Sequence, residues 1–257
     1  MTRFRHPETA ALVLAAGQGT RMMSDLAKVL HPMAGQPLLA YVLETLDDLA
    51  VGRVLVVVGH QRERVMAAFA GAEVEWVVQA EQCGTGHAVL MAAPALEGFE
   101  GILLVVCGDT PLLRATTLHA LLEGHAASRA AVTVLSMRVP DPHGYGRVLR
   151  APDGGIAGIV EERDATAEQR GIDEVNSGVY AFDYPRLAEA LASLTARNAQ
   201  GEYYLTDTVA LMGRRGLRTA VVCAGDHREL LGINTVDQLA DAERVHRELG
   251  AGREERP

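Results

Sequence analysis

Apolar, β-rich segments alternate with amphipathic segments through the first half of the chain, and this alternation restricts the possible folds more than any other feature. Apolar strands separated by helices predict a mainly parallel sheet with helices on both faces. We therefore predict an α/β, Rossmann-like doubly wound fold. The predicted strands are 11–15, 54–58, 74–78, 102–107 and 131–137, and the predicted helices are 38–49, 63–70, 85–93 and 115–126.

Ligands bind beyond the carboxyl ends of the strands in such a sheet. The loops after Ala15, Val78 and Cys107 are predicted to meet at that edge. Chemically informative residues in these three loops are therefore candidates for one site.

The pattern changes from about residue 141 to short strands with glycine-rich turns, which indicates an antiparallel lobe over the pocket. The polar stretch at 250–257 is predicted to be a frayed tail. The expected strands are 147–149, 155–160, 178–182 and 217–222, and the expected helices are 184–194, 206–214 and one from 235.

Composition limits the class of protein. The 257 residues are 48% hydrophobic, enough for one large domain with a smaller lobe. A net charge of −9 argues against nucleic-acid binding. No run is long enough to span a membrane or to form a signal sequence. The three cysteines are too few and too far apart for a zinc cluster, so we expect reduced, mostly buried thiols in a cytoplasmic protein.

The loop after the first strand carries Gly17 and Gly19, then Arg21 and Lys28. Glycines let backbone N–H groups approach an anion, and the two cations add charge. This pattern favours phosphate binding, although an ordinary strand-to-helix turn with incidental basic residues is the alternative.

Two common phosphate motifs are excluded. The Walker loop requires lysine after its second glycine, where this chain has Thr20 and Arg21, and the dinucleotide fingerprint requires a third glycine, where it has Met22.

Seven further segments, in order along the chain, accompany this loop. With Gly17–Met22 and Lys28–Leu30 they resemble the sugar-1-phosphate nucleotidyltransferases, and within them the uridylyltransferase domain of the bacterial bifunctional enzyme that makes UDP-N-acetylglucosamine. The resemblance implies the nucleotide-diphospho-sugar transferase fold. The segments are Gln79–Ala88, Gly108–Leu112, Gly144–Arg147, Ile159–Glu161, Glu174–Gly178, Asn198–Asp207 and Gly232–Asn234.

The resemblance implies a Mg²⁺-dependent transfer of a uridylyl group from UTP to N-acetylglucosamine 1-phosphate. It implies catalytic roles for Arg21 and Lys28 and metal ligation by Asp109 and Asn234. One Asp and one Asn suit Mg²⁺, which prefers few protein oxygens. The implied nucleotide-binding residues are Leu14, Ala15, Ala16, Gly17, Gln79, Gly84 and Thr85. The implied sugar-binding residues are Cys107, Gly108, Gly146, Glu161 and Asn176, with Tyr204 and Thr206 as additions.

Several alternatives stay open. Asn234 before Thr235 is also an ordinary helix cap, and Lys28 alone is also an ordinary surface lysine. His87 is expected to be structural, since an ionised sugar phosphate needs no general base. The sugar could instead be glucose, and dTTP could replace UTP. A domain that binds nucleotide sugars without catalysis is the alternative from another class.

The chain departs from the family pattern at three places. Ala27 replaces a common proline, which predicts a less rigid loop, while Ser177 and Cys107 replace Thr and Tyr and can alter the fit around the sugar.

We expect one nucleotidyltransferase domain over 1–257. Its nucleotide half covers about 10–140, its sugar lobe and return to the core about 141–234, and its last helix and tail about 235–257. No hexapeptide repeat is present. We therefore expect neither a left-handed β-helix acetyltransferase domain nor the trimer built on it, and sequence does not determine the oligomeric state.

Overall fold

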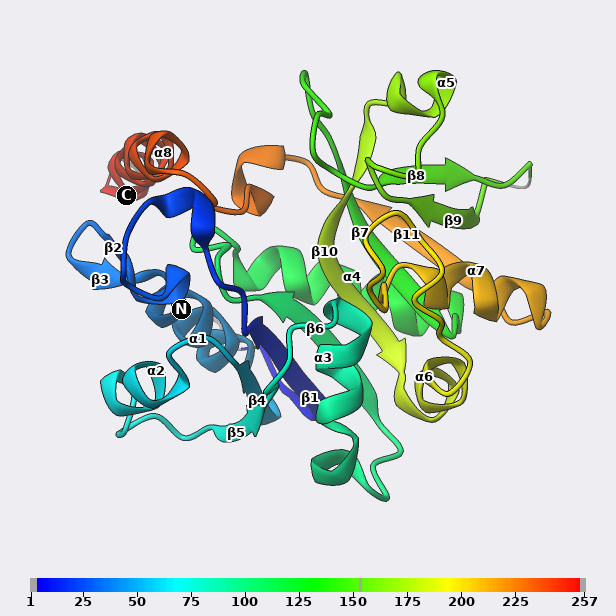
Figure 1. The fold of residues 1–257 in the computed structure, drawn as a ribbon, viewed down its shortest axis with the longest axis horizontal. Helices are drawn as coiled ribbons and strands as arrows, with labels where there is room; N and C mark the ends of the chain where they lie inside the picture. The colour runs from blue at the N-terminus through cyan, green and yellow to red at the C-terminus, as the bar shows by residue number, and fades with distance from the viewer. Residues whose placement is uncertain (1–3, 153, 255–257) are drawn as a thin grey trace.

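The computed structural model describes residues 4–152 and 154–254, with side chains described up to residue 248. Its main sheet has the strand order β11-β7-β10-β6-β1-β4-β5. These strands are β1 (His6–Ala15), β4 (Val51–Val58), β5 (Glu75–Val78), β6 (Ile102–Cys107), β7 (Val132–Arg138), β10 (Glu174–Asp183) and β11 (Thr219–Cys223). β1 pairs in parallel with β4 and β6, and β4 with β5 (Figure 1). The predicted α/β fold with a mainly parallel sheet is confirmed.

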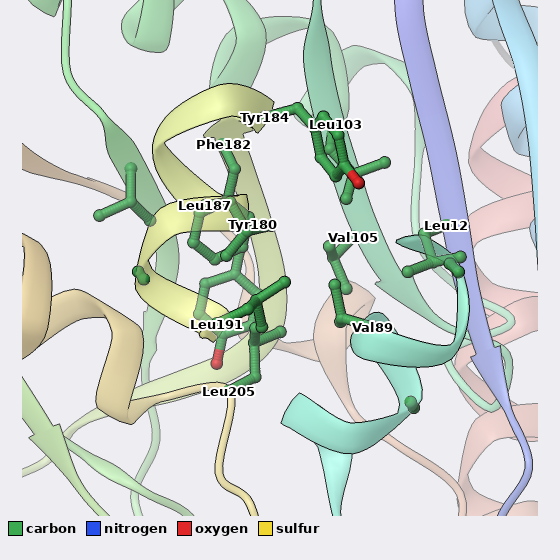
Figure 2. Packing of buried hydrophobic residues seen from close by; sticks show 14 of the residues in the cluster. Leu12, Val89, Leu103, Val105, Tyr180, Phe182, Tyr184, Leu187, Leu191 and Leu205 are labelled. Carbon is green, nitrogen blue, oxygen red and sulfur yellow. The ribbon is translucent and has the colours of Figure 1, made fainter. Parts of the chain in front are cut away.

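Helices cover both faces of the sheet because alternate side chains of each strand enter different cores. In β1, Leu12 packs on one face, and Val13 packs on the other. The first face is covered by α3 (Thr85–Met91), α6 (Tyr184–Leu191) and α7 (Asp207–Arg214). Figure 2 shows Val89 of α3 and Leu187 and Leu191 of α6 lying against the sheet. The second face is covered by α1 (Leu38–Leu49), α2 (Arg62–Ala68) and α4 (Ala115–Ser128).

The assignment of 178–182 to an antiparallel lobe over the pocket is wrong in part. The segment belongs to the ten-residue strand β10, which lies inside the main sheet and runs antiparallel to both β6 and β7. Tyr180 and Phe182 are buried there in the main core. An apolar run does not reveal its partner strands, so this position depended on long-range pairing.

The small lobe consists of β8 (Arg147–Arg150) and β9 (Ile156–Val160), an antiparallel pair joined to the main sheet through β10. A short helix that sequence did not predict, α5 (Ala167–Arg170), begins with a capping box in which Thr166 and Gln169 bond reciprocally. In Figure 1 this lobe lies at the upper right, beyond the carboxyl end of β7.

A third apolar cluster joins the loop after β1 to the last helix of the chain. The hairpin of β2 (Pro32–Met33) and β3 (Gln36–Pro37) packs under the last helix, α8 (Val236–Glu254). Met22, Met33 and Val245 are buried together in this cluster. α8 therefore lies beside the glycine-rich loop after β1, at the upper left of Figure 1.

Two predicted ends require correction. β1 begins at His6 rather than at residue 11, because His6 pairs with Val51 and Thr9 pairs with Ile102 before the apolar run starts. The stretch predicted to be a frayed tail from residue 250 is helical as far as Glu254, since each residue added to an existing helix gains one hydrogen bond. Residues 255–257 of that prediction lie outside the described residues.

A helix suited to spanning a bilayer is absent from the part of the chain that the structure describes.

Candidate active site

The residues from 16 to 30, which we call the signature loop, leave β1 and form two short 3₁₀ turns, Thr20–Met22 and Lys28–Leu30. Gly19, immediately before the first turn, has a φ of 65°, and a Cβ there would lie 2.7 Å from Cβ of Lys28. The loop therefore needs glycine at 19 to fold back on Lys28. At Gly17 a Cβ would meet nothing within 4 Å, so the protein itself leaves open space beside this glycine.

Four side chains from distant segments meet above the carboxyl ends of β1 and β6. The ammonium of Lys28 donates to Oδ2 of Asp109 and, at 3.1 Å, to Oδ1 of Asn234. Nη2 of Arg21 donates to the same Asn234 oxygen at 3.0 Å. The Lys28 and Asp109 side chains are only 16% and 15% exposed. Two cationic side chains thus converge on the side-chain oxygens of Asp109 and Asn234, and the Lys28–Asp109 pair is partly desolvated.

Local backbone bonds hold the segments that carry Asp109 and Asn234. N–H of Gly108 donates to the carbonyl of Leu14 at 2.9 Å, which extends the pairing of β6 and β1 up to Asp109. N–H of Ile233 donates to the carbonyl of Asp109 at 2.9 Å. The segment before α8 is therefore bound directly to the end of β6.

The cap of α8 is Thr235 and not Asn234. Oγ1 of Thr235 accepts from N–H of Gln238 at 3.2 Å, while the Gln238 side chain accepts from N–H of Asn234 at 2.8 Å. This reciprocal pair satisfies two amide groups at the start of the helix. The Asn234 side chain is consequently left to bond Lys28 and Arg21.

Gln79 lies after β5 at the same edge and is 3% exposed. Its Nε2 donates to the carbonyl of Gly84 at 3.1 Å and lies 3.0 Å from Nδ1 of His87. Because an amide nitrogen only donates, this His87 nitrogen accepts. Among the described residues Oε1 of Gln79 has no partner, so the side chain is oriented with its acceptor free.

The turn that starts α3 is fastened to the segment 203–205. Gly84 has a φ of 103°, and a Cβ there would lie 2.6 Å from the carbonyl oxygen of Tyr203. Oγ1 of Thr85 accepts from N–H of Leu205 at 3.1 Å. The close approach explains why glycine stands at 84, and it uses the Thr85 hydroxyl within the protein.

The lobe contributes a second polar group around Glu161. Oγ1 of Thr206 donates to Oε1 of Glu161 at 3.0 Å, and a Cβ on Gly146 would lie 3.3 Å from both carboxylate oxygens. Burial raises the pKa of Glu161, and the Thr206 bond only partly opposes this. Glycine at 146 therefore leaves room beside a desolvated carboxyl group.

Asn176 is fixed beside this group by β10. Its N–H donates to the carbonyl of Gly146 at 2.8 Å, and its Nδ2 donates to the hydroxyl of Tyr180 at 2.6 Å. Burial, followed by the charge of Glu161, raises the pKa of Tyr180 well above its ordinary value. The tyrosine therefore stays neutral and holds the amide.

Residues 11–250 match the profile of the MobA-like NTP transferase domain. The chain belongs to this family. It is 47% identical over 248 residues to the bifunctional protein GlmU of Geobacter metallireducens, covering 94% of this chain and 52% of that protein. It is 52% identical over 240 residues to the bifunctional protein GlmU of Streptomyces griseus subsp. griseus, covering 92% of this chain and 50% of that protein. The chain thus spans about half the length of the curated relatives it matches.

Membership in the NTP transferase family makes the chain a nucleotidyltransferase and agrees with the resemblance drawn from the motifs. Two of the chain's departures now have a structural context. Ala27 has a φ of −54°, the value that proline would impose, so the loop keeps this path without the ring. Oγ of Ser177 donates to the carbonyl of Leu135 at 2.6 Å.

The third departure, Cys107, is directed toward β10. Its Sγ donates to the carbonyl of Gly178 at 3.6 Å, and burial together with the charge of Asp109 raises its pKa to about 12. Cys107 is therefore a neutral thiol in this NTP transferase. All three cysteines are free, as expected. The expectation that they are mostly buried is wrong, since Cys223 is exposed and Cys83 is half-buried.

Sequence reasoning missed two residues that organise the site. Arg147 is 1% exposed, and its Nη2 lies 2.7 Å from Oε2 of Glu162, which joins the start of β8 to the segment after β9. Gln61, described below, bonds the signature loop. Neither was singled out, because an arginine or glutamine is ordinarily a surface residue. In contrast, the Thr235 cap has a readable signal, a threonine three residues before a glutamine.

Proposed function

We propose that this chain transfers a uridylyl group from UTP to N-acetylglucosamine 1-phosphate and releases UDP-N-acetylglucosamine and pyrophosphate. The observation that carries the proposal is the convergence of two cationic side chains with Asp109 and Asn234. A reaction between two anions requires such charge. The relatives' name and the family description support this reaction class.

In the proposed reaction an oxygen of the sugar phosphate attacks the α-phosphorus of UTP. A new P–O bond forms as the bond to pyrophosphate breaks, and pyrophosphate leaves with the bonding electrons. The sugar phosphate is already ionised, so neither a general base nor a protein nucleophile is needed. The neutral thiol of Cys107 is consistent with direct transfer.

Arg21 is proposed to bind the triphosphate and the charge that develops in the transition state, because its guanidinium stays charged and can bond two oxygens at once. Lys28 is proposed to bind the α-phosphate or the sugar phosphate. Both cations lie at the mouth of the glycine-rich turn, where backbone N–H groups add further donors. The role of the protein is to hold the two anions in line and cancel their repulsion.

Asp109 and Asn234 are proposed to hold Mg²⁺. The ammonium group of Lys28 contacts a side-chain oxygen of each residue. The two oxygens are therefore close enough to approach a single cation, as Mg²⁺ would require. A carboxylate and an amide oxygen are the hard ligands that Mg²⁺ takes, with waters and phosphates completing its shell. When bound, the ion supplies positive charge to the phosphate oxygens.

Gln79 is proposed to read the base. Its Nε2 is engaged by Gly84 and His87, so its free Oε1 is an acceptor for the N3–H of uracil. Cytosine has an acceptor at N3 and is expected to be rejected. Thymine has the same N3–H, which keeps dTTP as an alternative. Gly84 and Thr85 are proposed to form the backbone wall beside the base, and Leu14 to Gly17 are proposed to bind the nucleotide as well.

Glu161, Asn176 and Gly146 are proposed to bind the sugar, with Cys107 and Gly108 below it. A half-buried carboxylate and a fixed amide are suited to sugar hydroxyls. We further propose that about 10–140 forms the nucleotide half and about 141–234 the sugar half, within one cytoplasmic domain. The identity of the sugar is the finest part of the proposal, because glucose differs from N-acetylglucosamine at one substituent.

The test is pyrophosphate release, measured with four nucleoside triphosphates against several sugar 1-phosphates in the presence of Mg²⁺. We expect the pair of UTP and N-acetylglucosamine 1-phosphate to be the best. Faster turnover of glucose 1-phosphate or of dTTP would replace the proposed substrate. No release with any pair would favour the alternative of a non-catalytic domain that binds nucleotide sugars.

A further inference from the structure

Gln61 lies between β4 and α2, outside the four side chains that converge on the phosphate site. Its φ is 52°, in the left-handed region, where a side chain is disfavoured and glycine is preferred. The side chain nevertheless extends to the signature loop and bonds its backbone. We propose that Gln61 is a positioning residue that holds Lys28 in place for its contact with Asp109 and Asn234.

The glutamine amide bonds the loop on both sides of Leu26. Its Nε2 donates to the carbonyl of Asp25, and its Oε1 accepts from N–H of Ala27 at 3.2 Å. Nη1 of Arg64 donates to the same Oε1 at 3.1 Å and fixes the orientation of the amide. A single side chain thus satisfies a donor and an acceptor of the loop immediately before Lys28.

Two further bonds support this part of the loop: Nη1 of Arg64 also donates to the carbonyl of Asp25 at 3.4 Å, and N–H of Leu26 donates to Oγ of Ser24 at 3.1 Å. Among the bonds to described residues, the one from Gln61 is the bond that holds the amide of Ala27. Met23 and Asp25 are exposed, whereas Ala27 is only 2% exposed and enters the core with Val29. The path of the backbone at Ala27 determines where the Lys28 side chain begins. A shift there moves the ammonium away from two oxygens that belong to other parts of the chain, and displacements of this kind are costly in catalysis.

Gln61→Gly separates positioning from stability. Glycine accepts a φ of 52° more readily than glutamine, so the variant is expected to melt at the same temperature as the parent or higher. A residue with a merely structural role would lose stability and function together. The matched control is Arg129→Gly, since Arg129 has a φ of 51° at the end of α4, is exposed, and lies outside the site.

The activity readout rests on the proposed function. For Gln61→Gly we expect kcat to fall about tenfold, while KM for the sugar phosphate changes less than twofold, because the sugar group is not touched. Arg129→Gly is expected to keep both constants. A Gln61→Gly enzyme with kcat within twofold of the parent would overturn the positioning role.

A second readout needs no activity. Hydrogen exchange in the ligand-free protein is expected to accelerate at residues 24–28 in Gln61→Gly and to stay unchanged in Arg129→Gly. If the parent transfers no nucleotide, the proposed function fails while exchange still tests Gln61. Unchanged exchange at Ala27 would refute the inference whatever the activity. Faster exchange with full activity would refute it as well, because the loop would then have loosened without any effect on Lys28.

Discussion

Replacing Lys28 with methionine is expected to tighten the binding of a divalent cation to the free protein. Lys28 bonds the two oxygens that we propose as metal ligands, so a metal ion must first displace its ammonium. Methionine has a similar length and no charge, and it leaves Asp109 and Asn234 available. The same lysine is proposed to bind phosphate, so the variant is expected to lose activity while it gains affinity for the metal.

The magnitude follows from the contacts. A hydrogen bond to a charged group contributes about 1.5–3 kcal/mol. The Lys28 and Asp109 side chains are 16% and 15% exposed, so water weakens their attraction only in part. Every ~1.4 kcal/mol is a tenfold change in affinity, which gives a gain of about 10- to 100-fold in the variant.

The assay is a titration of the nucleotide-free protein with Mn²⁺, followed by the electron paramagnetic resonance signal of the free ion. Arg21→Met is the matched control, because Arg21 bonds Asn234 from an exposed position and, among the described residues, does not bond Asp109, so its effect is expected to be small. Equal or weaker Mn²⁺ binding by Lys28→Met would refute the reasoning. Loss of the gain in a Lys28→Met, Asp109→Asn double variant would assign the ion to this carboxylate.

Three further results are expected. Arg21→Ala lowers kcat by several orders of magnitude with little change in sugar-phosphate affinity, and steady-state kinetics within threefold of the parent would contradict its transition-state role. The free energy of unfolding of Glu161→Gln is expected to rise relative to that of the parent between pH 4 and 7. The raised pKa of Glu161 means that the folded parent loses stability when this carboxyl group ionises. Parallel pH profiles of urea unfolding for the two proteins would contradict this. Arg147→Met is expected to lose about 2–4 kcal/mol of unfolding free energy, because it breaks the ion pair with Glu162, whose side chain is 22% exposed. A loss below ~1 kcal/mol in urea unfolding would contradict this.

Local elements were predicted well where one physical signal dominated. The helix at 38–49 and the strand at 102–107 have the predicted bounds, because an amphipathic repeat and a continuous apolar run each have one favourable geometry. The prediction at 85–93 was too long, since α3 ends at Met91 and a 3₁₀ turn containing Pro94 follows. The strand at 178–182 was recognised, but its antiparallel place between β6 and β7 depended on pairings across the chain.

Part of the candidate site could likewise be predicted from sequence, and part depended on the tertiary fold. Parallel strands bring their carboxyl ends to one edge, so sequence alone could predict that the loops after Ala15, Val78 and Cys107 belong together. It also indicated the NTP transferase family, because glycines, cations and acids in order are local features. The Thr235 cap of α8 has a local sequence signal, but the contact of the freed Asn234 side chain with Lys28 depends on the tertiary fold.

Only the tertiary structure decided which charges meet. The contact of Lys28 with Asp109 and Asn234 joins residues 81 and 206 positions apart, and it depends on the bond between Ile233 and Asp109 and on the fold of the signature loop. Likewise, Gln61 acts across 34 residues on the amide of Ala27. Sequence determined the chemical groups available and the edge of the sheet at which they gather. Their pairing is set by packing between distant segments, which no local pattern encodes.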